Sequence, residues 1–282
     1  MGDMDGMDGQ AAAGRGRRRS RPPAGKALTT AVALAAGAAL AVPAGIRAPA
    51  TAAPLGDAAT TGAATAGPLT GGAGPAVRYG TTTSSNWAGY TAVGGTYRSV
   101  RASWTQAAVR CAAGATTWSS FWAGLDGAGT ATVEQIGTAA DCSSGRPSSY
   151  AWYELYPAYP VRLSGRVAPG DRMSASVTAG SRGSFTLRLT DSTRHWTRTA
   201  TGRVPAAAHG SAEVVAEAPT GIRGVLPLSR FGTTRFSGVE VDGHALSSSR
   251  PVRVTMADRG VTRASTSPLG NGTAFTVVWR HG

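Results

Sequence analysis

The sequence has few of the residues from which metal centres and helical folds are built. Only two cysteines and four histidines occur among 282 residues, and Lys26 is the sole lysine. No His-Glu-x-x-His sequence, no paired Cys-x-x-Cys motif and no phosphate-binding glycine pattern is present, so we expect no metal and no cofactor. Aromatic residues make up 7% of the chain, glycines number 39, and no amphipathic helical stripe exceeds two turns. These features exclude coiled coils, helical bundles and collagen, and argue against a doubly wound nucleotide-binding fold.

Acidic residues are also scarce, but the positive charge they leave is spread thinly. The chain carries 28 basic and 15 acidic residues, a formal net charge of +13. After residue 57, 21 arginines and 11 acids remain, and the arginines occur singly rather than in dense runs. A basic domain can attract nucleic acid, but scattered arginines are more typical of a solvated surface. We therefore expect no nucleic-acid partner.

The N-terminal region has the features of an export signal. A basic segment from Arg15 to Lys26 precedes an uncharged, weakly hydrophobic stretch, and small residues at 48–52 follow at the spacing that signal peptidase needs. A membrane anchor is the alternative, but the stretch is mostly Ala and Gly and is interrupted by Pro43. We predict a signal peptide over residues 1–53, a secreted, extracellular protein and no stable membrane anchor.

The next segment separates this signal from the folded part. Residues 58–77 carry no charge and consist of Ala, Gly, Thr, Pro, a single Leu and a single Val. Such a composition cannot bury enough apolar surface to fold. We interpret residues 54–78 as a linker or short pro-segment and residues 79–282 as one domain.

Export also determines how the two cysteines are interpreted. In an oxidising compartment Cys111 and Cys142 can pair with each other, which leaves no free thiol. A catalytic cysteine is therefore not expected. The bond would close a loop of about thirty residues and contribute about 3 to 4 kcal/mol in the chain-entropy model.

Alternation of apolar and polar residues with a period of two dominates the rest of the chain. It is seen in four segments: 100–105, 173–178, 185–190 and 252–256. Each is typical of a half-buried strand, and turn residues such as Pro169-Gly170-Asp171 lie between them. Many short strands in about 200 residues predict an all-β, single-domain fold, an antiparallel two-sheet β-sandwich of the concanavalin or lectin type.

A fold of this kind does not define a function, so candidate sites must come from side chains. In the segment Trp152-Tyr153-Glu154-Leu155-Tyr156, alternation places Glu154 on one face with two aromatics. This arrangement suits a ligand cleft, and it suits a partly exposed acid at a sheet rim equally well.

Two further segments hold polar groups that a strand would bury. In residues 132–137, alternation places Gln135 and Glu134 on opposite faces, so one of them must face inward. Glu213 and Glu217 share a face if their segment is a strand. A buried carboxylate needs a partner, and spacing alone favours structural roles for these residues over catalysis.

A serine hydrolase is poorly supported. His209-Gly210-Ser211 is the one place where histidine and serine lie close in sequence, and no Gly-x-Ser-x-Gly elbow occurs.

Several ordered segments together resemble the glutamic peptidases, or eqolisins, in their secreted bacterial form. They extend from about Ser84 to the region of Phe236. The matching pieces are Ser85-Asn86-Trp87-Ala88-Gly89-Tyr90, Phe121-Trp122-Ala123-Gly124-Leu125-Asp126-Gly127, Thr132-Val133-Glu134-Gln135-Ile136-Gly137-Thr138, Tyr150-Ala151-Trp152-Tyr153-Glu154-Leu155-Tyr156-Pro157, Ser211-Ala212-Glu213-Val214-Val215-Ala216-Glu217-Ala218-Pro219 and Leu226-Pro227-Leu228.

The resemblance implies a sandwich of two seven-stranded sheets with a catalytic glutamine and glutamate facing each other across a concave cleft. Matched residue by residue, these fall on Gln135 and Glu217. The residues that the matching segments assign to substrate binding are Glu154, Trp87, Trp122, Asp126 and Trp152. We therefore expect a monomeric, secreted acid endopeptidase that cleaves polypeptide substrates.

In the chemistry that this resemblance implies, Glu217 takes a proton from a water and the amide of Gln135 stabilises the oxyanion. This sequence departs from the family pattern at two points that bear on substrate preference and pH range. Val214 stands where an aromatic is usual, and the domain is basic whereas fungal members are acidic.

Two alternatives use the same residues differently. A glycoside hydrolase would pair the carboxylates of Glu154 and Glu217 and leave Gln135 without a chemical role. A non-catalytic carbohydrate-binding module would stack sugars on Trp87, Trp122 and Trp152.

Overall fold

The computed structural model describes residues 80–221 and 224–282. The predicted signal peptide, residues 1–53, and the predicted linker, residues 54–78, lie outside the described residues. The described chain is almost entirely β-structure. Its helical turns are two short 3-10 segments, η1 (Ser181–Gly183) and η2 (Leu246–Ser249), as the all-β prediction requires. None of the helices in this part of the chain has the length and apolar character to cross a membrane.

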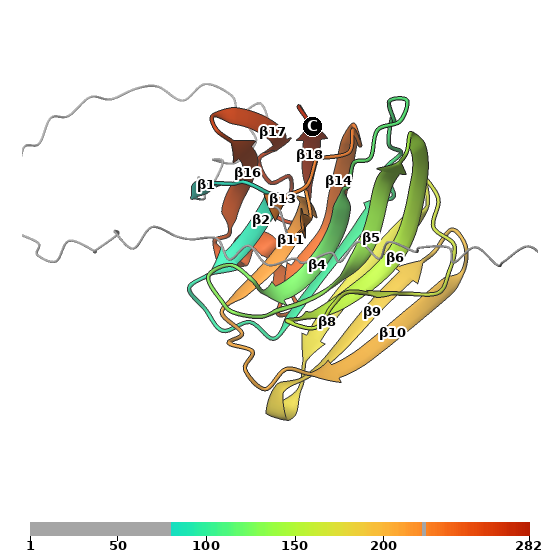
Figure 1. The fold of residues 1–282 in the computed structure, drawn as a ribbon. Helices are drawn as coiled ribbons and strands as arrows, with labels where there is room; N and C mark the ends of the chain where they lie inside the picture. The colour runs from blue at the N-terminus through green and yellow to red at the C-terminus, as the bar shows by residue number, and fades with distance from the viewer. Residues whose placement is uncertain (1–79, 222–223) are drawn as a thin grey trace, which may run out of the picture. The chain divides into compact units, whose positions relative to one another are not determined.

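Two layers of antiparallel strands face each other (Figure 1). The site layer, so named because it carries the candidate site, consists in spatial order of β2 (Trp87–Val93), β11 (Ser211–Glu217), β4 (Ser120–Asp126), β5 (Val133–Ser143), β6 (Arg146–Tyr156) and β7 (Val161–Arg162). The opposite layer consists of β10 (Trp196–Arg203), β9 (Ser184–Asp191), β8 (Arg172–Ala179), β3 (Ser99–Thr105) and β14 (Thr233–Val241). Strands of the two layers contact each other, as β4 does with β3 and β8.

The two layers are joined at one side by three strands. These are β18 (Phe275–Trp279), β17 (Val261–Thr266) and β16 (Val252–Asp258), which connect β14 to β2 through an unbroken hydrogen-bonded path. The two predicted layers of the sandwich are thus linked through these three strands into one continuous hydrogen-bonded path. The remaining strands are peripheral: β1 (Thr81–Ser84) pairs in parallel with β16, β15 (His244–Ala245) pairs with β14, and β12 (Thr220–Gly221) pairs with β13 (Gly224–Val225).

The core between the layers is formed by the alternating apolar residues of the predicted strands. In β8 and β9 every second side chain is buried, and these buried residues include Val177, Leu187 and Leu189. In the site layer, Leu125 and Ile136 face the same core. The period-two segments therefore form half-buried strands, and burial of these side chains provides the main stabilising term.

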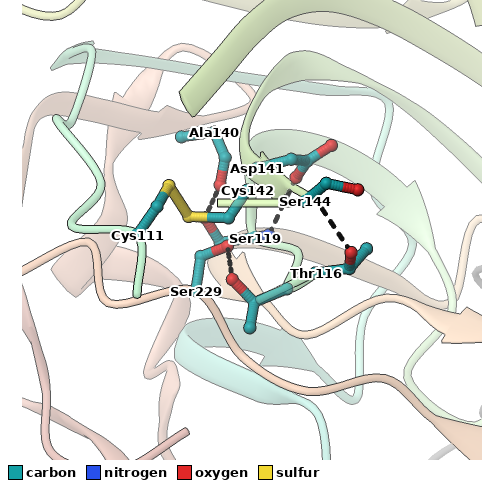
Figure 2. Close-up of a disulfide and its surroundings, with 9 residues drawn as sticks. Cys111, Thr116, Ser119, Ala140, Asp141, Cys142, Ser144 and Ser229 are labelled. Carbon is teal, nitrogen blue, oxygen red and sulfur yellow. Dashed lines mark hydrogen bonds between the residues drawn. A yellow bond between two sulfur atoms is a disulfide. The ribbon is translucent and has the colours of Figure 1, made fainter. Parts of the chain in front are cut away.

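A disulfide fixes one end of the site layer (Figure 2). Cys111 lies outside the strands, and Cys142 lies near the end of β5, so the predicted pairing is present. Thr117 exchanges backbone hydrogen bonds of 3.0 and 2.9 Å with Cys142. Ser119 binds the same strand, because its Oγ donates to the carbonyl of Ala140 at 2.5 Å. The disulfide and these hydrogen bonds thus attach the segment that leads into β4 to the neighbouring strand, β5.

Candidate active site

The candidate site lies on the face of the site layer that is turned away from the core, here called the site face. In β4, Phe121, Ala123 and Leu125 pack in the core, whereas Trp122 packs in a second cluster on the other face. That second cluster is composed of Trp87, Trp122, Val133, Ala139, Trp152, Val215 and Val254. The three tryptophans predicted to bind substrate, Trp87, Trp122 and Trp152, thus lie together.

Strand register places the other predicted residues on this face in three rows across β11, β4, β5 and β6. The rows are Glu217, Ser120, Ala139, Tyr150; then Val215, Trp122, Gly137, Trp152; then Glu213, Gly124, Gln135, Glu154. Gln135 and Glu154 are direct neighbours. Glu217 lies two strands from Gln135 and four residues further along the strands, with the row of Trp122 between them.

The indole of Trp122 lies between the row of Glu217 and the row of Gln135. Its Nε1 donates a hydrogen bond of 2.7 Å to Oε2 of Glu217. Its ring lies over Gly124, since a Cβ at that position would lie 2.8 Å from Cζ3 of Trp122 and 3.1 Å from Cβ of Gln135. At Gly137 a Cβ would lie 2.6 Å from Cβ of Trp122. Glycine at both positions therefore allows the indole to lie between Glu217 and Gln135.

Glu217 is buried among hydrogen-bond donors. Asn86 Nδ2 donates to its Oε1 at 3.2 Å, and Ser120 Oγ and Trp122 Nε1 donate to its Oε2 at 3.4 and 2.7 Å. Burial raises the pKa of Glu217 to about 7, and the hydrogen bonds from these donors oppose that rise. A carboxyl with this pKa can both accept and release a proton near neutral pH.

Gln135 is held by the second carboxyl of the face. Its Nε2 donates a hydrogen bond of 2.6 Å to Oε2 of Glu154. Burial raises the pKa of Glu154 to about 8, and the charge of Glu217 adds to the rise. The Oε1 of Gln135 is buried and has no hydrogen-bond partner among the described residues. One amide hydrogen and this oxygen are thus available to a water or a substrate.

The carboxylate of Asp126, which was predicted to bind substrate, is hydrogen-bonded to backbone N–H groups. Asp126 has a φ of 64°, is fully buried, and accepts hydrogen bonds from the backbone N–H groups of His209 (2.9 Å) and Gly210 (2.7 Å). Its carboxylate holds the segment between β10 and β11, which favours a structural role over contact with substrate.

Glu134 and Glu213, two further buried carboxyls, lie on opposite faces of the site layer. Glu134 is the partner of Leu125 and Leu155, which pack in the core, so Glu134 is the inward residue of the Glu134 and Gln135 pair. Glu213 shares the site face with Glu217, as its spacing predicts. Both carboxyls are fully buried, and burial raises the pKa of each, which the neighbouring hydroxyls of Thr132 and Ser211 oppose.

The remaining candidates do not form a second site. Trp87 and Trp122 pack edge to face with ring centroids 5.1 Å apart, and both are buried, so neither offers a free ring face for a sugar. His209 stacks on Phe185, and Ser211 Oγ accepts from the backbone N–H of Ala128, so these residues form no nucleophile and base pair. No three His, Cys, Asp or Glu side chains of residues 80–221 and 224–282 are placed to share a metal ion.

Sequence reasoning did not assign Asn86 to the candidate site. Its motif was recognised, yet its amide was given no role, and the contact with Glu217 joins residues 131 positions apart. An asparagine next to a tryptophan at the start of a buried strand was the available signal.

Comparison with known proteins decides the family. Residues 85–277 match the sequence model described as the Peptidase A4 family, which is well over half of the chain. The chain belongs to the Peptidase A4 family. No curated protein sequence matches it.

Solved structures agree with this family in their fold. Scytalido-glutamic peptidase with a transition state analog inhibitor superposes with a TM-score of 0.60 at 22% identity, over 70% of this chain and 98% of that one. SCP-B, a member of the Eqolisin family in a complex with the tripeptide Ala-Ile-His, superposes with a TM-score of 0.56 at 21% identity and the same coverage. This Peptidase A4 protein is therefore a hydrolase, a glutamic endopeptidase, with the β-sandwich of that family.

Proposed function

We propose that this peptidase cleaves peptide bonds within polypeptides by means of a water molecule activated by Glu217 and an oxyanion stabilised by Gln135. The observation that carries the proposal is the placement of both side chains on one buried face, with Trp122 bonded to Glu217 and its ring over Gly124, the strand neighbour of Gln135. No covalent intermediate is needed.

The chemistry follows from the hydrogen bonds of each group. Ionised Glu217 takes a proton from the water, whose oxygen then attacks the scissile carbonyl carbon. The amide hydrogen of Gln135 that is not bonded to Glu154 donates to the developing oxyanion, a contribution of about 3 to 4 kcal/mol in comparable sites. Protonated Glu217 then passes its proton to the departing amine, which breaks the C–N bond.

Glu154 supports this role of Gln135. Because its pKa is about 8, Glu154 keeps its proton while Glu217 ionises near pH 7. The hydrogen bond from Gln135 to Glu154 fixes the amide plane, so the remaining N–H points in one direction.

Matched substitutions test the assignment. Glu217→Gln should lower kcat for casein or a quenched peptide by at least about 10²-fold, the scale of general-base catalysis. Gln135→Ala should lower kcat by about 10² to 10³ with little change in KM. Glu213→Gln is the control, because it makes the same change four residues away on the same strand and face and should leave activity in place.

The outcomes separate the alternatives. Peptidase activity retained by either dyad variant, with a melting curve like that of the wild type, would refute the dyad. If Glu154→Gln and Glu217→Gln both abolished hydrolysis of a glycoside while casein stayed intact, the chain would act as a glycosidase.

Export is part of the proposal and depends on the N-terminal sequence. A basic segment, an uncharged stretch and small residues at 48–52 support removal of residues 1–53. N-terminal sequencing of the protein from culture medium should find a start at about residues 51–54. A mature start before Arg21 would contradict secretion by this signal.

A further inference from the structure

An arginine lies at the open edge of the site face. Arg162 belongs to β7, the last strand of the site layer, and its register partner is Trp152 of β6. Residues paired in this way share a face, so Arg162 extends the row of Val215, Trp122 and Trp152. Its side chain is exposed, whereas the dyad is buried.

The guanidinium of Arg162 is held in place by an aromatic ring. Its Cζ lies 3.8 Å from the centroid of Tyr150, which lies on the same face of β6. The hydroxyl of Tyr150 donates a hydrogen bond of 2.9 Å to Oδ2 of buried Asp141. The ring is thus fixed at its polar end and supports the guanidinium at its face.

This stacking leaves the hydrogen-bond donors of Arg162 available. Contact with a ring uses the flat surface of a guanidinium, and the N–H groups point outward in its plane. Among the described residues no ion pair or hydrogen bond engages them. A planar fork of free donors at a peptide-binding face suits a carboxylate, which accepts two parallel hydrogen bonds.

The charge of the described surface also favours an acidic substrate. Most carboxylates of the described residues are buried, and those that reach the surface are Glu240, Asp242 and Asp258. Glu240 forms an ion pair with Arg101, and Asp242 accepts hydrogen bonds from backbone N–H groups. Arginine therefore dominates the surface, and the resulting positive potential attracts acidic polypeptides.

We propose that Arg162 forms a cationic subsite of this peptidase that binds an aspartate or glutamate side chain of the substrate. β7 lies two strands beyond β5, which carries Gln135, a separation of about 10 Å. An extended peptide that crosses the strands from β5 to β7 covers this distance in about three residues. The acidic side chain is then bound about three residues from the scissile bond. This inference rests on the proposed function of the site.

A peptide library and matched kinetics test the subsite. Mass spectrometry of a library cleaved at pH 6 and low salt should show Asp and Glu enriched at one position about three residues from the cut. Two peptides that differ by Glu or Gln at that position should then differ about fivefold in kcat/KM, the scale of one exposed ion pair. Arg162→Gln should remove this ratio, and Arg162→Glu should favour Lys at the same position.

Arg166→Gln is the control, because it removes the same charge from an exposed residue four positions along the chain. It should lower the rate of acidic peptides only slightly, through the weaker overall field, and should keep most of the Glu to Gln ratio. An unchanged ratio in Arg162→Gln, or an equal fall for both peptides, would overturn the subsite and leave a structural role beside Tyr150. Failure of the wild type to cleave any peptide would instead refute the proposed function, and the subsite with it.

Discussion

The side-chain amide of Asn86 donates a hydrogen bond of 3.2 Å to Oε1 of Glu217. Asn86 is itself fixed, because Ser84 Oγ donates to its Oδ1 at 3.0 Å and accepts from the backbone N–H of Trp87 at 3.1 Å. A backbone hydrogen bond joins the same two segments, since the N–H of Ala218 donates to the carbonyl of Asn86 at 2.8 Å. The start of β2 is thus built to hold the end of β11.

Asn86→Ala should weaken the proposed base. Loss of a donor to a charged group destabilises the ionised form of Glu217 by about 1.5 to 3 kcal/mol, so the pKa of Glu217 should rise. We expect kcat to fall about tenfold or more near pH 6, KM to change little, and the pH profile to move to higher pH. Ser85→Ala is the control, since Ser85 is adjacent and exposed. A uniform loss of rate with an unmoved pH profile would show that Asn86 only supports the fold.

The pH profile of the wild type should report the two carboxyls of the site face. If Glu217 is the base, kcat/KM falls about tenfold per pH unit below its pKa of about 7. Loss of the proton from Glu154, whose pKa is about 8, ends the favourable range on the alkaline side. The resemblance implies an acid optimum, which stays a prediction, and the site favours a maximum near neutrality. Kinetics on one peptide between pH 3 and 9 decide, and a maximum near pH 3 would contradict a base of raised pKa.

Stability should fall as pH rises, because buried carboxyls hold their protons more tightly in the folded state. Burial raises the pKa of Glu134 from its ordinary value of 4.5 to about 8, and the charge of Asp126 adds to the rise. The folded form therefore binds more protons than the unfolded form between these values, and each unit of difference costs about 1.4 kcal/mol. The free energy of unfolding should be highest below about pH 4.5 and decrease toward pH 8.

Glu134→Gln should reduce this dependence, because it keeps the shape of the neutral acid. Urea unfolding at pH 5, 6.5 and 8 should show a smaller loss of stability in this variant than in the wild type. Glu240→Gln provides the comparison, since that glutamate is paired with Arg101 at the surface and its pKa is lowered. A slope in Glu134→Gln equal to that of the wild type would assign the pH dependence to the other buried carboxyls.

Strand positions and faces could be predicted from sequence because they depend on local alternation. Ile136 and Gly137 settle the orientation of their strand: Ile136 packs in the core, and Gly137 leaves room for Trp122, so Gln135 lies with Gly137 on the site face. The faces of Glu213 and Glu217 follow from the same rule.

Long-range register and special backbone conformations could not be predicted in this way. The contact between Asn86 and Glu217 depends on how β2 and β11 pair, which no local pattern encodes. The positive φ of Asp126 turns its carboxylate toward the chain before β11, whereas simple alternation would not. Arg162 lies in a strand of two residues, too short to show any alternation.

The disulfide should account for a measurable share of stability. Cys111 and Cys142 are 31 positions apart, and in the chain-entropy model a loop of this size corresponds to about 3 to 4 kcal/mol. We expect the free energy of unfolding of the double variant Cys111→Ser, Cys142→Ser, measured by urea unfolding, to be lower by this amount. Thiol titration of the unfolded, unreduced wild type should find no free cysteine. One or two reactive thiols would show that the bond does not form.

Gly124→Ala should damage the site more than the fold. The new Cβ would lie 2.8 Å from Cζ3 of Trp122 and 3.1 Å from Cβ of Gln135, so the indole has to move. Overpacking of this kind costs about 1 to 3 kcal/mol, and movement of Trp122 also breaks its 2.7 Å hydrogen bond to Glu217. We expect kcat to fall by about tenfold or more while the protein still melts cooperatively.

Gly270→Ala is the matched control for this substitution. The nearest atom to its new Cβ, the carbonyl oxygen of Ala274, lies 3.7 Å away, which is an ordinary contact. Activity and melting temperature should therefore stay close to those of the wild type. If Gly124→Ala kept full activity with an equally stable fold, Trp122 could shift without consequence, and its bond to Glu217 would not be what positions the base.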